Sequence, residues 1–250
     1  MEKEEQQKFY HSLVFPTILM IILWLVKITE VVFKTSFADY GLLPQTWIGL
    51  RGIIFSPFLH ANFAHLSANS LPLFFLTAGL FYYYGKKATS IFILSLLITG
   101  FWVLIFAKDT WVHIGASGVV YALATFHFTS GVLRREPRMM AFSLLVVFLY
   151  GSLVWGIIHD FSPDKNISWQ SHMLGGLAGI ILAFAYRQDG PQRIIYQWED
   201  DEDEDNQEYE DLEDQPGQES GEQSESHLET KTTQSTGPQT GVNYIYKEKE

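Results

Sequence analysis

Two polar residues that lie far apart in the sequence could do chemistry together. Ser117 stands among small residues, and His172 opens a glycine-rich hydrophobic segment. A hydroxyl alone is a weak nucleophile, but a neutral imidazole within about 3 Å can take its proton as it attacks a carbonyl carbon. If the two side chains meet, they form a nucleophile and base for acyl transfer.

A second pair could stabilise the charge that such an attack creates. His65 and Asn69 are four residues apart, so in a helix they share one face. We expect them, with the backbone N–H of Ser117, to donate to the oxyanion of a tetrahedral intermediate. Loss of one such donor in other enzymes costs about 2.7 to 4 kcal/mol. Tyr121 lies one turn from Ser117 on the same face.

Small residues indicate how the helices that carry Ser117 and His172 pack. Gly175 and Gly179 form a strip spaced for close helix contact, which lets another helix approach tightly. If this strip packs on the face of Gly118, Ser117 meets His172.

Each of these residues also has a structural interpretation. A serine in a membrane helix commonly bonds a carbonyl of the preceding turn. His172 could be a core histidine bonded to a neighbouring helix, and His65 and Asn69 could join helices. Because the serine, the histidine and the donor residues all lie near one membrane leaflet, their combination favours a catalytic site.

Six hydrophobic segments are long enough to position these residues in a bilayer. A bilayer core about 30 Å thick needs roughly 20 apolar helical residues per crossing. In each segment apolar residues occupy every helix face, which predicts an all-α membrane protein. The segments are 13–32, 66–84, 88–107, 115–133, 139–158 and 169–186.

Charge divides the chain into unlike parts. Up to Gly190 there are 13 Lys and Arg against 10 Asp and Glu, and from Pro191 there are 4 against 18, which together give the net charge of −11. We therefore predict a short cytoplasmic segment at 1–12, a six-helix domain at 13–187, and a disordered acidic cytoplasmic tail at 188–250. The tail is a solvated spacer or a partner-binding segment that uses Tyr244 and Tyr246.

The connection 34–65 is rich in apolar and aromatic residues. We expect it to be structured, either lying partly in the membrane interface or packed on the bundle as an amphipathic loop. Basic residues in the short flanks place both termini in the cytoplasm and this connection outside. The first segment has no basic region before it, so we expect it to be retained rather than cleaved as a signal peptide.

Other intramembrane chemistries fit less well. The chain has no cysteine, which excludes disulfides and thiolate metal sites. His60 and His65 are five apart without the glutamate of a zinc-protease helix, so no metal or other cofactor is expected. Asp109 and Asp160 lie at segment ends, and Lys27 is interpreted as an i,i+3 partner of Glu30. Packing or interface roles, without a partner recognisable in sequence, are given to His11, His113, His127 and His159.

Taken together, these motifs resemble the rhomboid family of intramembrane serine proteases. The resemblance covers about residues 13–186 and depends on three motifs in order on the second, fourth and sixth segments. They are His65-x-x-x-Asn69 preceded by His60, Gly115-Ala116-Ser117-Gly118 with Tyr121, and His172-x-x-Gly175-x-x-x-Gly179.

The resemblance implies a six-helix bundle with a water-filled active site below the outer surface. It implies Ser117 as nucleophile, His172 as general base and Tyr121 packed on the imidazole, with His65 and Asn69 stabilising the oxyanion. The expected partners are the lipid bilayer and single-pass membrane proteins as substrates, with no cofactor and no nucleic acid; the oligomeric state is left open. The expected location is the plasma or inner membrane.

The chain also departs from the family pattern. Some members carry a Trp-Arg dipeptide in the first loop, whereas Trp47 and Arg51 are separated here. In relatives the fifth helix and its adjoining loop act as a lateral gate, and Tyr150 and Trp155 are candidate gate residues by position alone.

Two other functions compete with proteolysis. A rhomboid-like protein without activity could bind transmembrane helices, but such proteins typically lack Ser or His of the pair, and both are present. A small transporter would need polar residues in both halves of the bilayer, whereas those of this chain cluster toward one leaflet.

Overall fold

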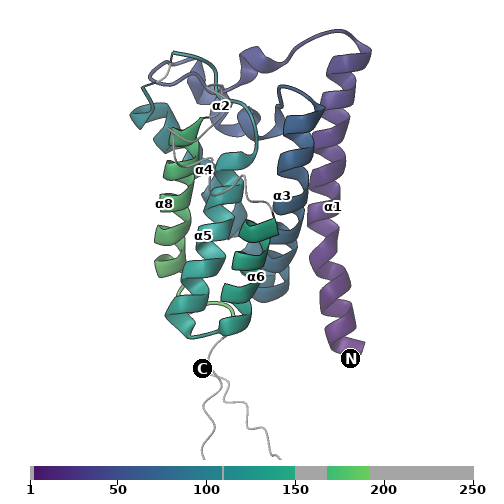
Figure 1. Ribbon diagram of the computed structural model, residues 1–250, viewed down its shortest axis with the longest axis vertical. Coiled ribbons are helices and arrows are strands. Elements are labelled where there is room, and N and C mark those ends of the chain that lie inside the picture. The colour runs from purple at the N-terminus through teal and green to yellow at the C-terminus, as the bar shows by residue number, and fades with distance from the viewer. Residues whose placement is uncertain (1–2, 109, 150–167, 192–250) are drawn as a thin grey trace, which may run out of the picture. The chain divides into compact units, whose positions relative to one another are not determined.

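The computed structural model describes residues 3–108, 110–149 and 168–191, and this part of the chain is helical and holds no strand (Figure 1). An isolated antiparallel bridge joins Leu42 to His113. The long helices are α1 (Lys3–Val32), α3 (Phe63–Tyr84), α4 (Ala88–Phe106), α5 (Ser117–Arg134), α6 (Pro137–Leu149) and α8 (Trp169–Ala185).

Helix α5 lies at the centre of the bundle. It contacts α3, α4, α6 and α8, and its most extensive contact is with α8. Most of its residues are buried, including Phe126 and His127. His127 shares a hydrogen bond of 3.0 Å with the carbonyl of Leu76 on α3. A helix that is apolar on all faces is expected in this position, because every face meets another helix.

Helix bounds differ from the predicted segments at four of the six starts, by two or three residues for α3, α5 and α6 and by ten for α1. Helix α1 begins at Lys3, ten residues before the predicted 13, because its Glu, Lys and Gln residues are good helix formers although too polar for a bilayer core. Helix α5 begins at Ser117 rather than at Gly115, whose φ of +115° is not helical. Tyr150, Trp155 and residues 192–250 lie outside the described residues.

The first loop is structured, as the sequence predicted. It contains the 3-10 turns η1 (Ala38–Tyr40) and η2 (Ser56–Phe58) and the short helix α2 (Gly49–Phe55), which packs on α4. Glycines allow this contact, since a Cβ on Gly100 of α4 would lie 3.1 Å from the Cα of Ile53. Trp47 beside this helix is 89% exposed.

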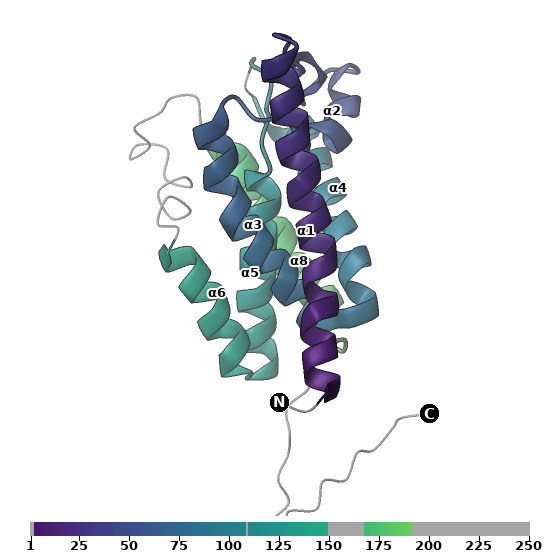
Figure 2. The same cartoon turned by 90° about the vertical axis from the view of Figure 1, so that its right-hand side faces the viewer.

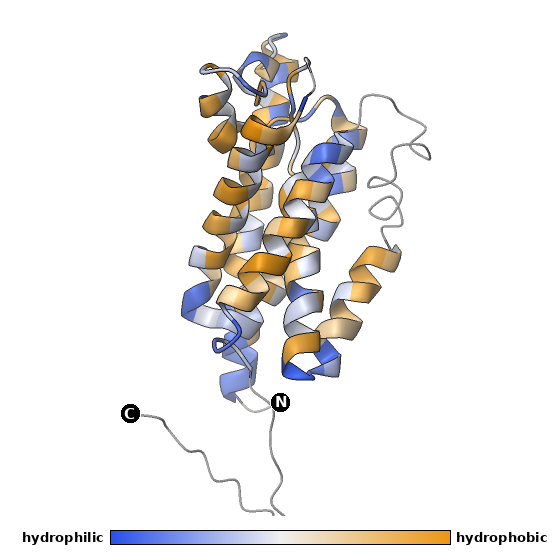
Figure 3. Cartoon of the chain, turned by 90° about the vertical axis from the view of Figure 1, so that its left-hand side faces the viewer, coloured by the Kyte–Doolittle hydropathy of each residue, from blue (hydrophilic) through white to orange (hydrophobic). Residues whose placement is uncertain are grey.

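Within the described residues, two helical stretches are long and apolar enough to cross a membrane. They are Lys3–Val32 and Phe63–Phe106, and the second comprises α3, η3 (Gly85–Lys87) and α4 in succession. Helices α6 and α8 contain shorter apolar stretches. Figure 3 shows hydrophobic residues along the middle of the helices and hydrophilic residues near their ends. This distribution fits helices that cross a bilayer.

Arg134 joins the ends of α5 and α8. Its buried guanidinium donates to the carbonyl of Tyr186 at 2.5 Å and to that of Asp189. It also lies over the ring of Tyr84 at 5.3 Å, and Lys87 is 3.5 Å from the Asp189 carboxylate. The chain that follows α8 is therefore fixed to α5 through backbone carbonyls.

Candidate active site

The two residues singled out for nucleophilic chemistry lie side by side. The Oγ of Ser117, the first residue of α5, is 2.8 Å from the Nε2 of His172 in the first turn of α8. His172 is 5% exposed, whereas Ser117 is half-buried. A hydrogen bond of this length is what transfer of a proton from the hydroxyl to the imidazole requires.

Glycines bring α5 and α8 close enough for this contact. A Cβ on Gly175 would meet the carbonyl oxygen of Gly118, and a Cβ on Gly179 would meet that of Ala122. The hydroxyl of Thr125 on α5 donates to the carbonyl of Gly176 on α8 at 2.7 Å. The predicted glycine strip thus packs on the predicted face, and the helix backbones touch.

The ring of Tyr121 covers the imidazole of His172. Their centroids are 4.2 Å apart, with 26° between the planes. Tyr121 is 4% exposed. Stacking on a buried ring restricts rotation of the imidazole, so Nε2 stays directed at the Ser117 hydroxyl.

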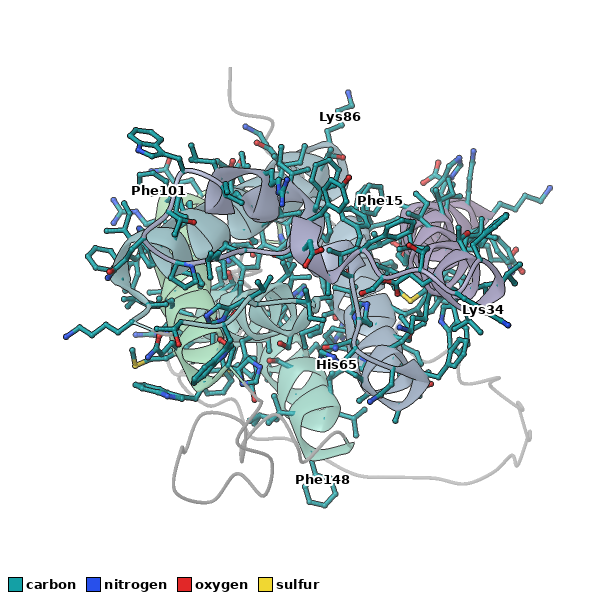
Figure 4. All side chains as sticks on the ribbon, turned by 90° about the horizontal axis from the view of Figure 1, so that it is seen from above. Phe15, Lys34, His65, Lys86, Phe101 and Phe148 are labelled. Carbon is teal, nitrogen blue, oxygen red and sulfur yellow. The ribbon has the colours of Figure 1, made fainter. Side chains whose placement is uncertain are left out.

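His65 and Asn69 approach the site from α3. The side chain of Asn62 caps α3 and accepts from the His65 backbone N–H at 2.8 Å, and the Asn69 amide donates to the His65 carbonyl at 3.1 Å. A Cβ on Gly115 would lie 2.8 Å from His65 Nε2 and 3.8 Å from Asn69 Nδ2. Figure 4 shows His65 toward the interior of the bundle. Both side chains therefore face the backbone two residues before Ser117, and glycine is needed there for its φ of +115° as well as for space.

His60 lies behind His65. It is 3% exposed, and its ring meets that of His65 edge to face at 5.1 Å. Burial, with a further contribution from His65, lowers the pKa of His60 to about 3, although the Phe58 backbone acts in the opposite direction. His60 is therefore neutral at physiological pH.

A buried ion pair on α1 supports the segment that carries His60. The predicted pair of Lys27 and Glu30 is present at 3.0 Å, and both side chains are largely covered. Lys27 also donates to the carbonyls of His60 and Ala61 at 2.9 and 3.1 Å, and Glu30 accepts from the Phe37 backbone N–H at 2.7 Å. Sequence spacing identified the pair but not these contacts, which join residues distant in sequence.

His113, for which the sequence showed no partner, has one in the structure. Its Nδ1 lies 2.5 Å from the Oγ of Ser168, and its backbone pairs with Leu42 in both directions. Sequence reasoning did not single out Ser168, although a serine directly before the first residue of a helix is a capping signal that could have indicated it. His11 bonds the Gln7 carbonyl of its own helix at 2.8 Å, and His159 lies outside the described residues.

Metal ligands do not gather in the part of the chain that the structure describes. Residues 3–108, 110–149 and 168–191 contain no group of three or more His, Cys, Asp or Glu side chains that could hold an ion.

Comparisons with known proteins identify the family. The Rhomboid domain profile matches residues 46–189. An uncharacterized protein of Mycobacterium bovis is 33% identical over 180 residues, covering 69% of this chain and 73% of its own length, and an uncharacterized protein of Mycobacterium tuberculosis matches equally well. A Bacillus subtilis protein named as a candidate rhomboid protease is 26% identical over 136 residues, covering 54% of this chain and 66% of its own length.

The fold and these matches define an integral membrane protein built from apolar helices. The chain belongs to the rhomboid family. Members of this family are generally serine intramembrane proteases, and the family also contains inactive relatives. Which of the two kinds this chain represents is a question about Ser117 and His172.

Proposed function

We propose that this protein is an intramembrane serine endopeptidase that cleaves transmembrane segments of other membrane proteins. The observation that carries the proposal is the 2.8 Å contact between Ser117 Oγ and His172 Nε2 across the α5–α8 interface. An inactive relative would have no need to hold these two groups at proton-transfer distance. No cofactor enters the proposal.

The reaction would follow the ordinary course of serine proteolysis. With neutral His172, the Ser117 hydroxyl donates to Nε2 and passes its proton there as Oγ attacks the scissile carbonyl carbon. The imidazolium then protonates the leaving amine as the C–N bond breaks, which leaves an acyl-enzyme. As a water oxygen attacks the acyl carbon, His172 takes a proton from that water. The imidazolium then returns the proton to Ser117 Oγ as the ester C–O bond breaks, which releases the new carboxyl end.

The oxyanion would be stabilised by groups from two helices. Ser117 is the first residue of α5, so its backbone N–H has no partner within the helix and lies at the positive end of the helix dipole. His65 and Asn69 face the same backbone from α3. We assign all three as donors to the developing negative charge.

We further propose six membrane crossings with both termini in the cytoplasm. The crossings would be α1, α3, α4, α5, the segment that begins with α6, and α8. The site would lie toward the non-cytoplasmic side of a plasma or inner membrane, within reach of unwound ends of substrate helices. The acidic tail from residue 192 onward would be a disordered cytoplasmic segment. The predicted start at 188 is too early, because Asp189 is bound by Arg134 and Lys87.

Covalent labelling tests the proposal. A fluorophosphonate should label the purified full-length protein at Ser117, and labelling should vanish in Ser117→Ala and fall sharply in His172→Ala. Ser95→Ala is the matched control, since it removes a buried hydroxyl that bonds the Ile91 carbonyl of its own helix. Folded protein that takes up no label would instead favour a non-proteolytic helix-binding protein.

A further inference from the structure

A second Ser–His contact accompanies the proposed catalytic one. His113 precedes Ser117 by four residues, and Ser168 precedes His172 by the same number. The pairs are crossed between the two segments, because Ser117 contacts His172 and Ser168 contacts His113. Each segment thus contributes one hydroxyl and one imidazole.

The first loop fixes the backbone that carries His113. Leu42 N–H donates to the His113 carbonyl at 2.9 Å, and His113 N–H donates to the Leu42 carbonyl at 2.7 Å. Two residues further on, Gly115 N–H donates to the Ser56 carbonyl at 2.9 Å. The contact is close, since a Cβ on Gly41 would lie 2.7 Å from the His113 carbonyl oxygen. The backbone segment that precedes Ser117 is therefore fixed to the first loop at two residues, His113 and Gly115.

Ser168 fixes the start of α8. It is the N-cap residue, and its hydroxyl accepts from the Ser171 backbone N–H at 3.2 Å. The same oxygen contacts His113, which is 6% exposed. Because the Ser168 hydroxyl contacts both the Ser171 backbone N–H and the buried imidazole of His113, it fixes the start of α8 relative to His113. The cap lies in the same helical turn as His172.

We propose that His113 and Ser168 are a positioning pair, which holds the first turn of α8 at the distance from α5 that the Ser117–His172 hydrogen bond needs. They touch no reacting atom. Their effect would be on geometry, and a displacement of about 1 Å can lower a rate by about 100-fold. This inference rests on the proposed proteolytic function.

Kinetics of fluorophosphonate labelling test the pair in the full-length protein. In His113→Ala and in Ser168→Ala, the maximal inactivation rate should fall on the order of 10- to 100-fold, while the inhibitor concentration for half-maximal rate changes less than about twofold. The double variant should be no slower than the slower single variant, because either substitution breaks the same contact.

Conservative variants separate positioning from general stability. Ser168→Thr keeps the hydroxyl and the cap and should recover most of the inactivation rate, and His113→Gln serves where His113→Ala does not fold. His11→Ala, which removes an exposed histidine far from the site, should label like the unaltered protein. Folded His113 and Ser168 variants that label at the full rate would overturn the proposal. The proposal would also be overturned if the variants raised only the inhibitor concentration for half-maximal rate and kept the maximal rate. A fall in the maximal rate that Ser168→Thr does not recover would overturn it as well.

Thermal unfolding distinguishes failure of this inference from failure of the proposed function. If the unaltered protein takes up no label, the proteolytic assignment fails. The melting temperatures of the unaltered protein, His113→Ala, Ser168→Ala and the double variant still report the contact. Non-additive losses in the double variant would support a coupled pair. Additive losses would show that the two residues act separately and would refute it.

Discussion

The two sides of the candidate site are built by opposite means. On one side, α5 and α8 are positioned by the absence of side chains, since Gly175 and Gly179 let their backbones touch. On the other, α3 is positioned by polar groups, from the Asn62 cap to the pair of Lys27 and Glu30 on α1. Ser117 and His172 belong to the first side, and His65 and Asn69 to the second.

This difference indicates which kind of substitution each side tolerates. A backbone contact leaves no room for added atoms but needs no partner group, so it fails when a side chain grows. A polar network accepts small shifts but fails when one member is removed, because the remaining groups are then buried without partners. An added side chain at Gly175 or Gly179 should therefore disable the first side, and removal of a polar side chain from α1 or α3 should disable the second.

Removal of the Lys27 charge should have the largest effect. Lys27→Met leaves Glu30 buried without its cation, and breaking a buried pair in this way costs about 3 to 5 kcal/mol in the free energy of unfolding. Chemical unfolding in detergent would measure it. Lys8→Met is the control, since Lys8 and Glu5 are about half exposed and such pairs contribute less than about 1 kcal/mol. Equal effects of the two variants would contradict a supporting role for the α1 pair.

Removal of the Asn69 amide should slow the reaction without weakening substrate binding. Asn69→Ala should lower kcat by about 10²- to 10³-fold, because an oxyanion donor acts mainly in the transition state. Steady-state kinetics on a transmembrane substrate would separate kcat from KM. Ser70→Ala, at the next residue, removes a hydroxyl bonded to the Leu66 carbonyl and should change kcat little. An unchanged kcat in Asn69→Ala would exclude it from the site.

Two adjacent glycines on α8 should respond differently to one methyl group. Gly175→Ala places a Cβ against the Gly118 carbonyl, and overpacking of this kind costs about 1 to 3 kcal/mol, with a matching fall in labelling rate. A Cβ on Gly176 would meet Thr125 Cγ2 at 3.5 Å, an ordinary contact. Gly176→Ala should therefore retain labelling and gain about 0.5 to 1 kcal/mol in stability. The same loss in both variants would refute the backbone-contact argument.

The smallest expected effect is a dependence of stability on pH through His60. Its folded pKa is lowered to about 3 from 6.5. As pH falls below 6.5, the unfolded chain binds a proton that the folded chain does not, so stability is lost progressively down to about pH 3. At pH 5, below the unfolded pKa and above the folded one, the loss should be at most about 2 kcal/mol. Unfolding at about pH 7.5 and 5 should show a smaller loss in His60→Gln than in the unaltered protein, and equal losses would contradict burial of a neutral imidazole.

Much of the bundle could be predicted because its signals are local. Helix starts at Ala88 and Trp169 agree with the predicted segments, since hydrophobic length and glycine spacing are properties of short stretches. The meeting of Ser117 with His172 could be anticipated for the same reason, because two small-residue faces suggested one packing.

What could not be predicted depends on contacts between distant segments. Lys27 reaches the carbonyl of His60, and His113 reaches Ser168. Any residue has a backbone carbonyl, so the sequence does not indicate which carbonyl Lys27 binds. A cap residue such as Ser168 indicates where a helix begins, but not which other side chain its hydroxyl contacts. The extra turns at the start of α1 were missed for a different reason, because a bilayer criterion does not detect helix that continues into water.

The buried Arg134 determines how far the chain can be truncated from its C-terminal end. Its acceptors at Tyr186 and Asp189 are main-chain oxygens, so what must be retained beyond α8 is length rather than side-chain identity. A truncated version that ends after 190 keeps both acceptors, whereas one that ends at Ala185 would strand a covered guanidinium. The smallest stable unit should therefore extend past α8.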